Sequence, residues 1–161
     1  MLARLRGMLA DHVIAPRTIN TSATCKTAVA MAWLFMDVFR DDDAAAILSG
    51  AIPYIDGAGL AVVVRTASEL QLEAVVTRAV AALARSGEQQ RLAAVLLQVE
   101  HLRRHQRNEE AAHLLTESRQ EFPRPADRVR LGESLESGGN QDRALDLYRE
   151  VYRETRSENL G

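Results

Sequence analysis

Two histidines, His101 and His105, have the spacing in this chain that comes closest to a metal site. Residues four apart share one face of a helix, and two neutral imidazoles on one face can bind the same transition metal. The residues between them are Leu102, Arg103 and Arg104, so the glutamate of a helical zinc motif is absent and two cations repel a metal ion. Histidine and arginine in a helix's last turn also complement the macrodipole. We therefore favour a solvated helix end over a metal site.

The other residue types used in catalysis do not form a recognisable catalytic motif in this sequence. Cys25 falls near a predicted helix start, where a thiol pKa can be lowered, but no histidine is near it in the sequence, and a buried structural role is commoner. The sequence has no glycine-rich phosphate loop and no Gly-x-Ser-x-Gly motif. Glu133 and Glu136 fit the polar face of a helix. We therefore expect no enzyme, no catalytic residue and no cofactor.

Composition limits the class of protein. The chain has 161 residues, 47% hydrophobic and 26% charged, which is typical of a globular domain. A net charge of −2 argues against binding nucleic acid through phosphate neutralisation. A single cysteine cannot form an internal disulfide, which favours the cytoplasm. The longest apolar run, residues 28–36, is shorter than the roughly 20 residues of a membrane span.

The N-terminal segment has an amphipathic pattern. Apolar side chains recur on one helical face of residues 2–14, namely Leu2, Leu5, Met8, Leu9 and Val13. The polar face is not strongly basic, so a packing or capping helix is favoured over a membrane-surface helix. The segment is not expected to be a signal peptide, since polar residues interrupt it at Asp11 and His12 after Arg4 and Arg6. Pro16 ends the helix. Residues 1–23 are therefore predicted to be this helix and a polar linker.

The remaining segments read as helices joined by short connections. Residues 24–39 are apolar nearly all round, so we predict that they form the most buried helix, with Trp33, Phe35 and Phe39 in the core. Residues 58–65 contain three valines but have no partner strand, which favours a short buried helix. Capping residues and prolines delimit the other predicted helices, at 43–52, 68–85, 86–105, 108–121, 126–137 and 140–155. Residues 157–161 are predicted to be a disordered tail.

An internal repeat accompanies these helices. Residues 41–48, 108–115 and 140–147 each begin with polar or acidic residues and continue into an alanine-containing apolar helix. The gaps between them imply a period of about 33 residues and one further copy near position 79, where an alanine is present. Small residues thus recur at steps of 34, 33 and 32, at Ala45, Ala79, Ala112 and Ala144.

This pattern resembles the tetratricopeptide repeat family, whose units are helix-turn-helix pairs of 34 residues. The resemblance is clearest in residues 125–156. Leu131-Gly132 occupies the family's Leu-Gly position, Gly139 the turn, Ala144 the small position and Tyr148 the aromatic of the second helix. The resemblance is moderately specific over 85–156 and weak over 24–84.

The sequence also departs from the family pattern. Arg128 stands where the family prefers tryptophan, and the closing proline is absent. At the glycine position, the unit around Ala112 has Glu100 and the unit around Ala45 has Trp33, while the unit around Ala79 has no turn signal between its helices. An irregular helical bundle therefore remains the alternative to a repeat.

The resemblance implies an all-α fold of stacked antiparallel helix pairs over residues 24–156, forming a right-handed solenoid with a concave groove. Alignment with the family places in that groove Leu97, His101, Arg104, His105, Val129, Glu133 and Glu136. Val129 and Glu133 replace the lysine and asparagine with which some such repeats bind a C-terminal carboxylate, so that type of receptor is not expected. The resemblance implies a non-enzymatic adaptor that binds a partner peptide or helix.

Two other functions stay open. A chaperone-like protein, or a structural subunit of a helical assembly, would turn the apolar residues 24–65 toward a partner chain, and a homo-oligomer is possible in that case. A helical-bundle enzyme is the least favoured, because no acid–base pair, nucleophile or metal set supports it. We expect a protein partner, no nucleic acid and no membrane span.

Overall fold

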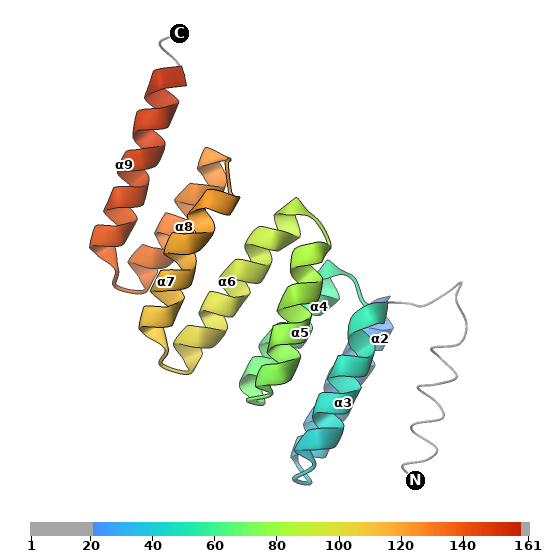
Figure 1. Cartoon of the computed structure of the whole chain (residues 1–161). Helices are drawn as coiled ribbons and strands as arrows, with labels where there is room; N and C mark the ends of the chain where they lie inside the picture. Colours follow the sequence, from blue (N-terminus) through green and yellow to red (C-terminus); the bar gives the residue numbers. More distant parts are fainter. Residues whose placement is uncertain (1–20, 159–161) are drawn as a thin grey trace. The chain divides into compact units, whose positions relative to one another are not determined.

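The computed structural model describes residues 21–158, which form eight α-helices and two short 3-10 helices, with no strand among them (Figure 1). The prediction of an all-α chain is confirmed. The predicted helix at residues 2–14 and the last three residues of the predicted tail lie outside the described residues.

The contacts divide the chain into two units, Met1–Ser86 and Gly87–Gly161. This boundary falls inside the single repeat domain predicted over residues 24–156. The described part of the first unit contains α2 (Thr21–Met36), α3 (Asp41–Ala51), η1 (Ile52–Tyr54), α4 (Gly57–Glu69) and α5 (Glu73–Arg85). The second unit contains α6 (Glu88–Arg104), α7 (Asn108–Ser118), η2 (Arg119–Glu121), α8 (Pro125–Ser137) and α9 (Gln141–Glu158).

Helices that follow one another pack in pairs, which are α2 with α3, α4 with α5, α6 with α7 and α8 with α9 (Figure 1). The turn inside every pair contains one residue with a positive φ, in the left-handed region that disfavours L side chains. These residues recur at intervals of 32, 35 and 33, and are Phe39 (φ 56°), Gln71 (φ 59°), Gln106 (φ 60°) and Gly139 (φ 80°).

The four turns also share one hydrogen bond. The amide following the left-handed residue donates to the carbonyl oxygen five residues earlier, from Arg40, Leu72, Arg107 and Asn140, over 2.9, 2.8, 2.9 and 3.0 Å. This bond and the left-handed residue define a Schellman motif, which satisfies orphan carbonyls at a helix C-terminus. The same device therefore ends the first helix of each pair.

The predicted helix at residues 68–85 was wrong at its start, because the turn at Gln71 interrupts it. Residues 68–85 are not a single helix, because α4 continues to Glu69 and α5 begins only at Glu73. Ser68 is 4% exposed in the last turn of α4 instead of capping a new helix. The prediction that residues 58–65 are helical is confirmed, since they lie inside α4.

The first helix is less buried than predicted. It begins at Thr21, inside the predicted linker, and ends at Met36, and only Cys25, Ala28 and Ala32 are buried. Among the described helices of this unit, α4 has more buried residues than any other, and its Val63 and Val64 are at most 1% exposed. The prediction of a most buried helix at residues 24–39 was therefore wrong. At the other end of the chain, α9 continues to Glu158, so the predicted tail begins inside a helix.

The recurring alanines lie on the second helix of each pair. Ala79, Ala112 and Ala144 are at most 1% exposed, while on α3 the fully buried residue is Ala44 and Ala45 is half-buried. Small side chains allow two helix axes to approach closely, because no Cβ branch separates them.

In unit 2 a close approach joins α8 to α9. A Cβ built on Gly132 would come within 2.9 Å of Tyr148 Cζ, so the aromatic ring rests on the glycine backbone. The core around this contact combines side chains from α6, α7, α8 and α9, including Leu92, Val99, Leu115, Phe122, Leu131, Leu135 and Leu147.

Candidate partner-binding surfaces

The predicted groove residues on α6 differ in exposure. Leu97 and His101 are buried, at 6% and 3%, whereas His105 is half-buried and Arg104 is exposed. The imidazole rings of His101 and His105 lie 4.6 Å apart between centroids at a tilted angle. Arg104 pairs with Glu100 over 3.7 Å on the same helix. Of these four residues, only Arg104 and His105, at the C-terminal end of α6, are therefore accessible.

The predicted groove residues on α8 lie on its solvent side. Val129 is half-buried, and Glu133 and Glu136 are exposed. The Tyr148 hydroxyl donates to Glu136 Oε2 over 3.3 Å. Burial raises the pKa of the Tyr148 hydroxyl, and the carboxylates of Glu136 and Glu133 raise it further. The two acidic residues thus border the tyrosine of α9 and give this side of α8 a negative edge.

Arg103, which the alignment did not place in the groove, connects α6 with α8. Its guanidinium donates to the Ser134 carbonyl and, over 3.2 Å, to Ser137 Oγ. It also fills the space beside Gly138, where a Cβ would come within 2.8 Å of Cζ. Partial burial lowers the pKa of Arg103. A cation at a helix C-terminus is favourable, so this contact holds the end of α8 against α6.

Arg128 performs a second bridging role, between α8 and α9. Its side chain is 10% exposed, pairs with Glu154, and lies 3.8 Å from Glu150. The hydrogen bond from Arg128 lowers the pKa of the Glu154 carboxyl. Arg128 therefore joins α8 and α9 by an ion pair.

A shallow hollow of about 260 Å³ lies between α6 and α7, bordered by Leu102, Leu114 and charged residues. The charges at its rim form local pairs, with Arg107 Nη2 at 2.7 Å from Glu110 Oε2 and His113 Nδ1 at 3.1 Å from Glu117 Oε2. Since each of these side chains is already paired with a neighbour three or four residues away along the chain, this hollow offers no convergent set of groups to a ligand.

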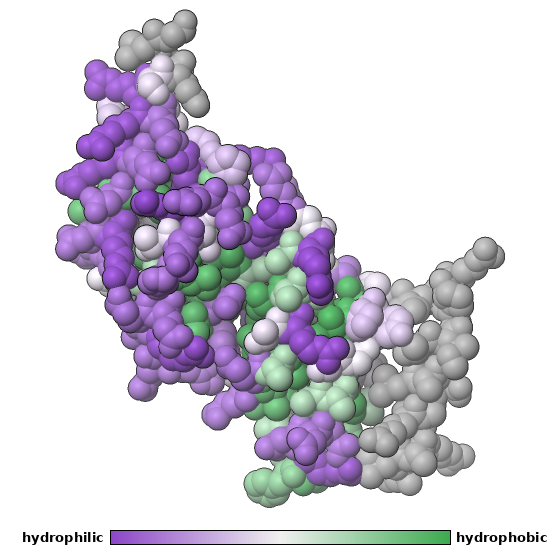
Figure 2. Space-filling model, viewed as in Figure 1, coloured by the Kyte–Doolittle hydropathy of each residue, from purple (hydrophilic) through white to green (hydrophobic). Residues whose placement is uncertain are grey.

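Large apolar side chains are exposed at the C-terminal end of α2. Trp33, Leu34, Val38 and Phe39 are 42%, 66%, 58% and 95% exposed. The prediction that Trp33 and Phe39 belong to the core was therefore wrong. Figure 2 shows apolar surface over α3 to α5 and a mostly hydrophilic surface over α7 to α9. An exposed cluster of large apolar residues is typical of an interaction site.

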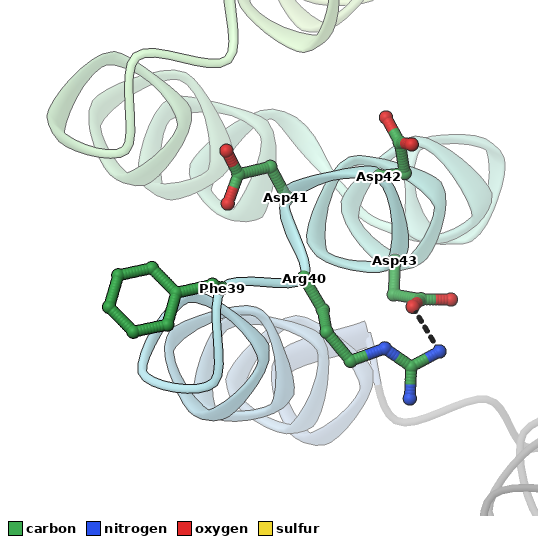
Figure 3. Close-up of a pocket in the computed structure, with 5 residues that line it drawn as sticks. All are labelled: Phe39, Arg40, Asp41, Asp42 and Asp43. Atoms are coloured by element: carbon green, nitrogen blue, oxygen red, sulfur yellow. Dashed lines mark ion pairs between the residues drawn. The ribbon is translucent and has the colours of Figure 1, made fainter.

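Acidic residues adjoin this cluster in the turn between α2 and α3. Phe39, Arg40 and the run Asp41, Asp42 and Asp43 border an open hollow of about 410 Å³ (Figure 3). Arg40 pairs with Asp43 and lies 5.4 Å from the ring centroid of Phe35. In Figure 3 the Phe39 ring points away from the carboxylates of Asp42 and Asp43. The exposed Phe39 ring and the acidic side chains of residues 41–43 therefore border the same hollow.

Cys25 has the features of a structural thiol. It is 4% exposed, and its Sγ donates to the Gly59 carbonyl over 3.5 Å, where α2 approaches α4. Burial raises the pKa of the thiol, and the charge of Asp56 raises it further. A raised pKa keeps the sulfur protonated, which disfavours a nucleophilic role.

Within residues 21–158, no three side chains of His, Cys, Asp or Glu are grouped so that they could hold a metal ion. Among the described helices, none combines the length and hydropathy needed to cross a membrane. Comparison of the chain with protein-family models, curated proteins and solved structures gave no match.

Proposed function

We propose that this chain is a helix-pair repeat scaffold of the tetratricopeptide type that binds a protein partner and has no catalytic activity. The observation that carries this proposal is the recurrence of one turn. Left-handed residues followed by the same hydrogen bond end the first helix of all four pairs, at intervals of 32 to 35 residues. Buried alanines follow on each second helix. Such regularity is the mark of repeat proteins, which present extended surfaces to partners.

The preferred binding surface is the exposed side of α8 with the last turn of α6. Val129 supplies an apolar contact, flanked by Glu133 and Glu136 on one helix and by Arg104 and His105 on the other. A partner peptide or helix of mixed charge fits this pattern. Desolvated apolar contacts carry most of the affinity at such surfaces, while charges at the rim mainly set association rates.

A second candidate function rests on the exposed cluster at the end of α2. A chaperone-like protein, or a subunit of a helical assembly, requires an apolar surface that a partner chain covers. The exposed side chains of Leu34, Val38 and Phe39 form such a surface, since 58% or more of each is accessible. In this function the partner covers the C-terminal end of α2 and the turn that follows it.

Two matched substitutions separate these functions. Val129→Asp places a charge on α8, and Val38→Asp places the same charge at the end of α2. Val62→Asp serves as the control, because Val62 is an exposed valine of α4, at 43%, outside both surfaces. Tagged wild-type protein is used to capture partners from an extract of the source cells, and the captured protein is then titrated against each purified variant.

The groove function requires that Val129→Asp lose binding while Val38→Asp and Val62→Asp retain it. The second function requires that Val38→Asp lose binding while Val129→Asp and Val62→Asp retain it. In that case, light scattering shows whether the chain self-associates. Retained binding in both test variants, with circular dichroism showing folded protein, contradicts both surfaces.

A further inference from the structure

One side of α9 that does not pack against α8 carries two large exposed side chains. The helix packs on α8 as the second helix pair of unit 2 (Figure 1). Its buried residues are Ala144, Leu147 and Val151. Leu145 and Tyr152 are 48% and 63% exposed, and because they lie two helical turns apart they share one line along the helix. This line offers apolar contact at two points about 10 Å apart.

Charged residues are arranged symmetrically around the middle of this line. Arg149 lies between Leu145 and Tyr152 on the same side of the helix and is exposed. On this side, exposed acidic residues precede Arg149 and exposed basic residues follow it. Asp142 and Arg156 lie seven residues before and after Arg149, and Asp146 and Arg153 lie three before and four after.

This order is self-complementary when two copies of α9 run in opposite directions. A two-fold axis at Arg149 brings Leu145 of each copy to Tyr152 of the other, and it brings the acidic half of each helix to the basic half of the other. The antiparallel direction also places the oppositely charged ends of the two helix dipoles side by side. We infer that this side of α9 is a two-fold interface, at which a second copy of the chain docks its own α9 antiparallel.

The neighbouring charges are compatible with this arrangement. The two Arg149 side chains meet at the axis, but each lies 3.3 Å from Asp146 of its own helix, so the axis carries no net charge. Three other charged residues of α9 are engaged within unit 2, in the ion pairs Arg143–Glu109, Glu150–Arg119 and Glu154–Arg128.

The order of charges favours a second copy over other occupants. Asp142 and Asp146 would be repelled by an anionic membrane or by nucleic acid phosphates. A second copy instead matches the acidic and the basic half at once, as an isologous contact requires. Tyrosine and arginine are also enriched at protein interfaces. This interface is separate from both proposed binding surfaces, which lie on α6 and α8 and at the end of α2.

Sedimentation velocity tests the interface directly. One helix pair buries less than the roughly 1,200 Å² of a standard interface, so we expect a weak dimer. The full chain is therefore measured from about 10 μM to 1 mM, where weak association becomes visible, and its mass should rise toward twice that of the monomer.

Charge reversals identify the face and the direction. Asp142→Arg and Arg156→Asp each turn two attractive contacts into repulsive ones, which should weaken the dimer roughly tenfold or more. Mixing these two variants restores opposite charges at both contacts, so the mixture should dimerise as well as wild type. Glu121→Arg and Arg78→Asp make the same changes of charge at exposed positions outside α9 and should leave the dimer unchanged. Circular dichroism of each variant checks that it is folded.

Four results would overturn the inference. A chain that stays monomeric at about 1 mM has no such interface. A dimer that both α9 variants retain uses another surface. A mixture that associates no better than either variant alone contradicts the antiparallel order. Val38→Asp should retain the dimer, and its loss there would move self-association to the end of α2.

Discussion

Replacing Gln106 with glycine should stabilise unit 2, although it removes a side chain and adds backbone freedom. Gln106 has a φ of 60° and is exposed, so no packing is lost. The left-handed conformation costs an L residue about 1–2 kcal/mol, which glycine does not incur. Glycine also has more conformational freedom in the unfolded chain, which lowers the free energy of unfolding by roughly 0.4–1 kcal/mol. The net gain in the free energy of unfolding should be about 0.5–1 kcal/mol.

Two further variants test whether the left-handed backbone conformation causes this change in the free energy of unfolding. Gly139→Ala forces a Cβ into the same conformation, at a φ of 80°, and that Cβ meets no atom within 4 Å. Its cost, about 1 kcal/mol, is therefore a backbone effect alone. Gln89→Gly, in the first turn of α6, is the matched glutamine-to-glycine control, and it should lose about 0.5–1 kcal/mol because its position is helical.

Urea unfolding followed by circular dichroism measures all three variants, and Trp33 fluorescence identifies the transition of unit 1. With a slope of about 2 kcal/mol per molar urea, the midpoint of Gln106→Gly should rise by roughly 0.3–0.5 M at an unchanged slope. A midpoint that falls in Gln106→Gly, as it does in Gln89→Gly, would refute the assignment of a strained left-handed residue at this turn.

Three further outcomes follow from unit 2. Ala144→Leu should overpack the α8–α9 contact and cost about 1–3 kcal/mol, and an unchanged melting temperature would contradict close packing there. Gly132→Ala should cost a similar amount because its Cβ meets the Tyr148 ring, and the loss should shrink in a Tyr148→Leu background, which a thermal double-mutant cycle measures. Because Arg128 lowers the pKa of Glu154, their pair contributes stability above the unfolded carboxyl pKa of about 4.3, which is lost as pH falls through the folded value. Urea midpoints between about pH 5 and pH 3 should therefore decline less in Arg128→Met than in wild type, and equal declines would count against this linkage.

The candidate surfaces were partly predictable. Alignment with the tetratricopeptide pattern placed Val129 and Glu133 on the groove side of a predicted helix, and the structure puts them on the solvent side of α8. The same alignment placed Leu97 and His101 in the groove, yet they are buried. Periodicity states which residues share a face, but burial depends on what packs against that face, which the local sequence does not contain. The contact of Arg103 with the end of α8 was missed for the same reason, since its partners lie more than 30 residues away.

The sequence by itself determined the helices and the recurring alanines, because helical periodicity and small-residue spacing are local properties that survive without tertiary contacts. It also marked one turn, at Gly139, where the residue type matches the conformation. Only the tertiary structure decided that Phe39, Gln71 and Gln106 adopt the same left-handed conformation. Each is disfavoured locally, and the packing of the two helices together with the shared hydrogen bond outweighs that cost.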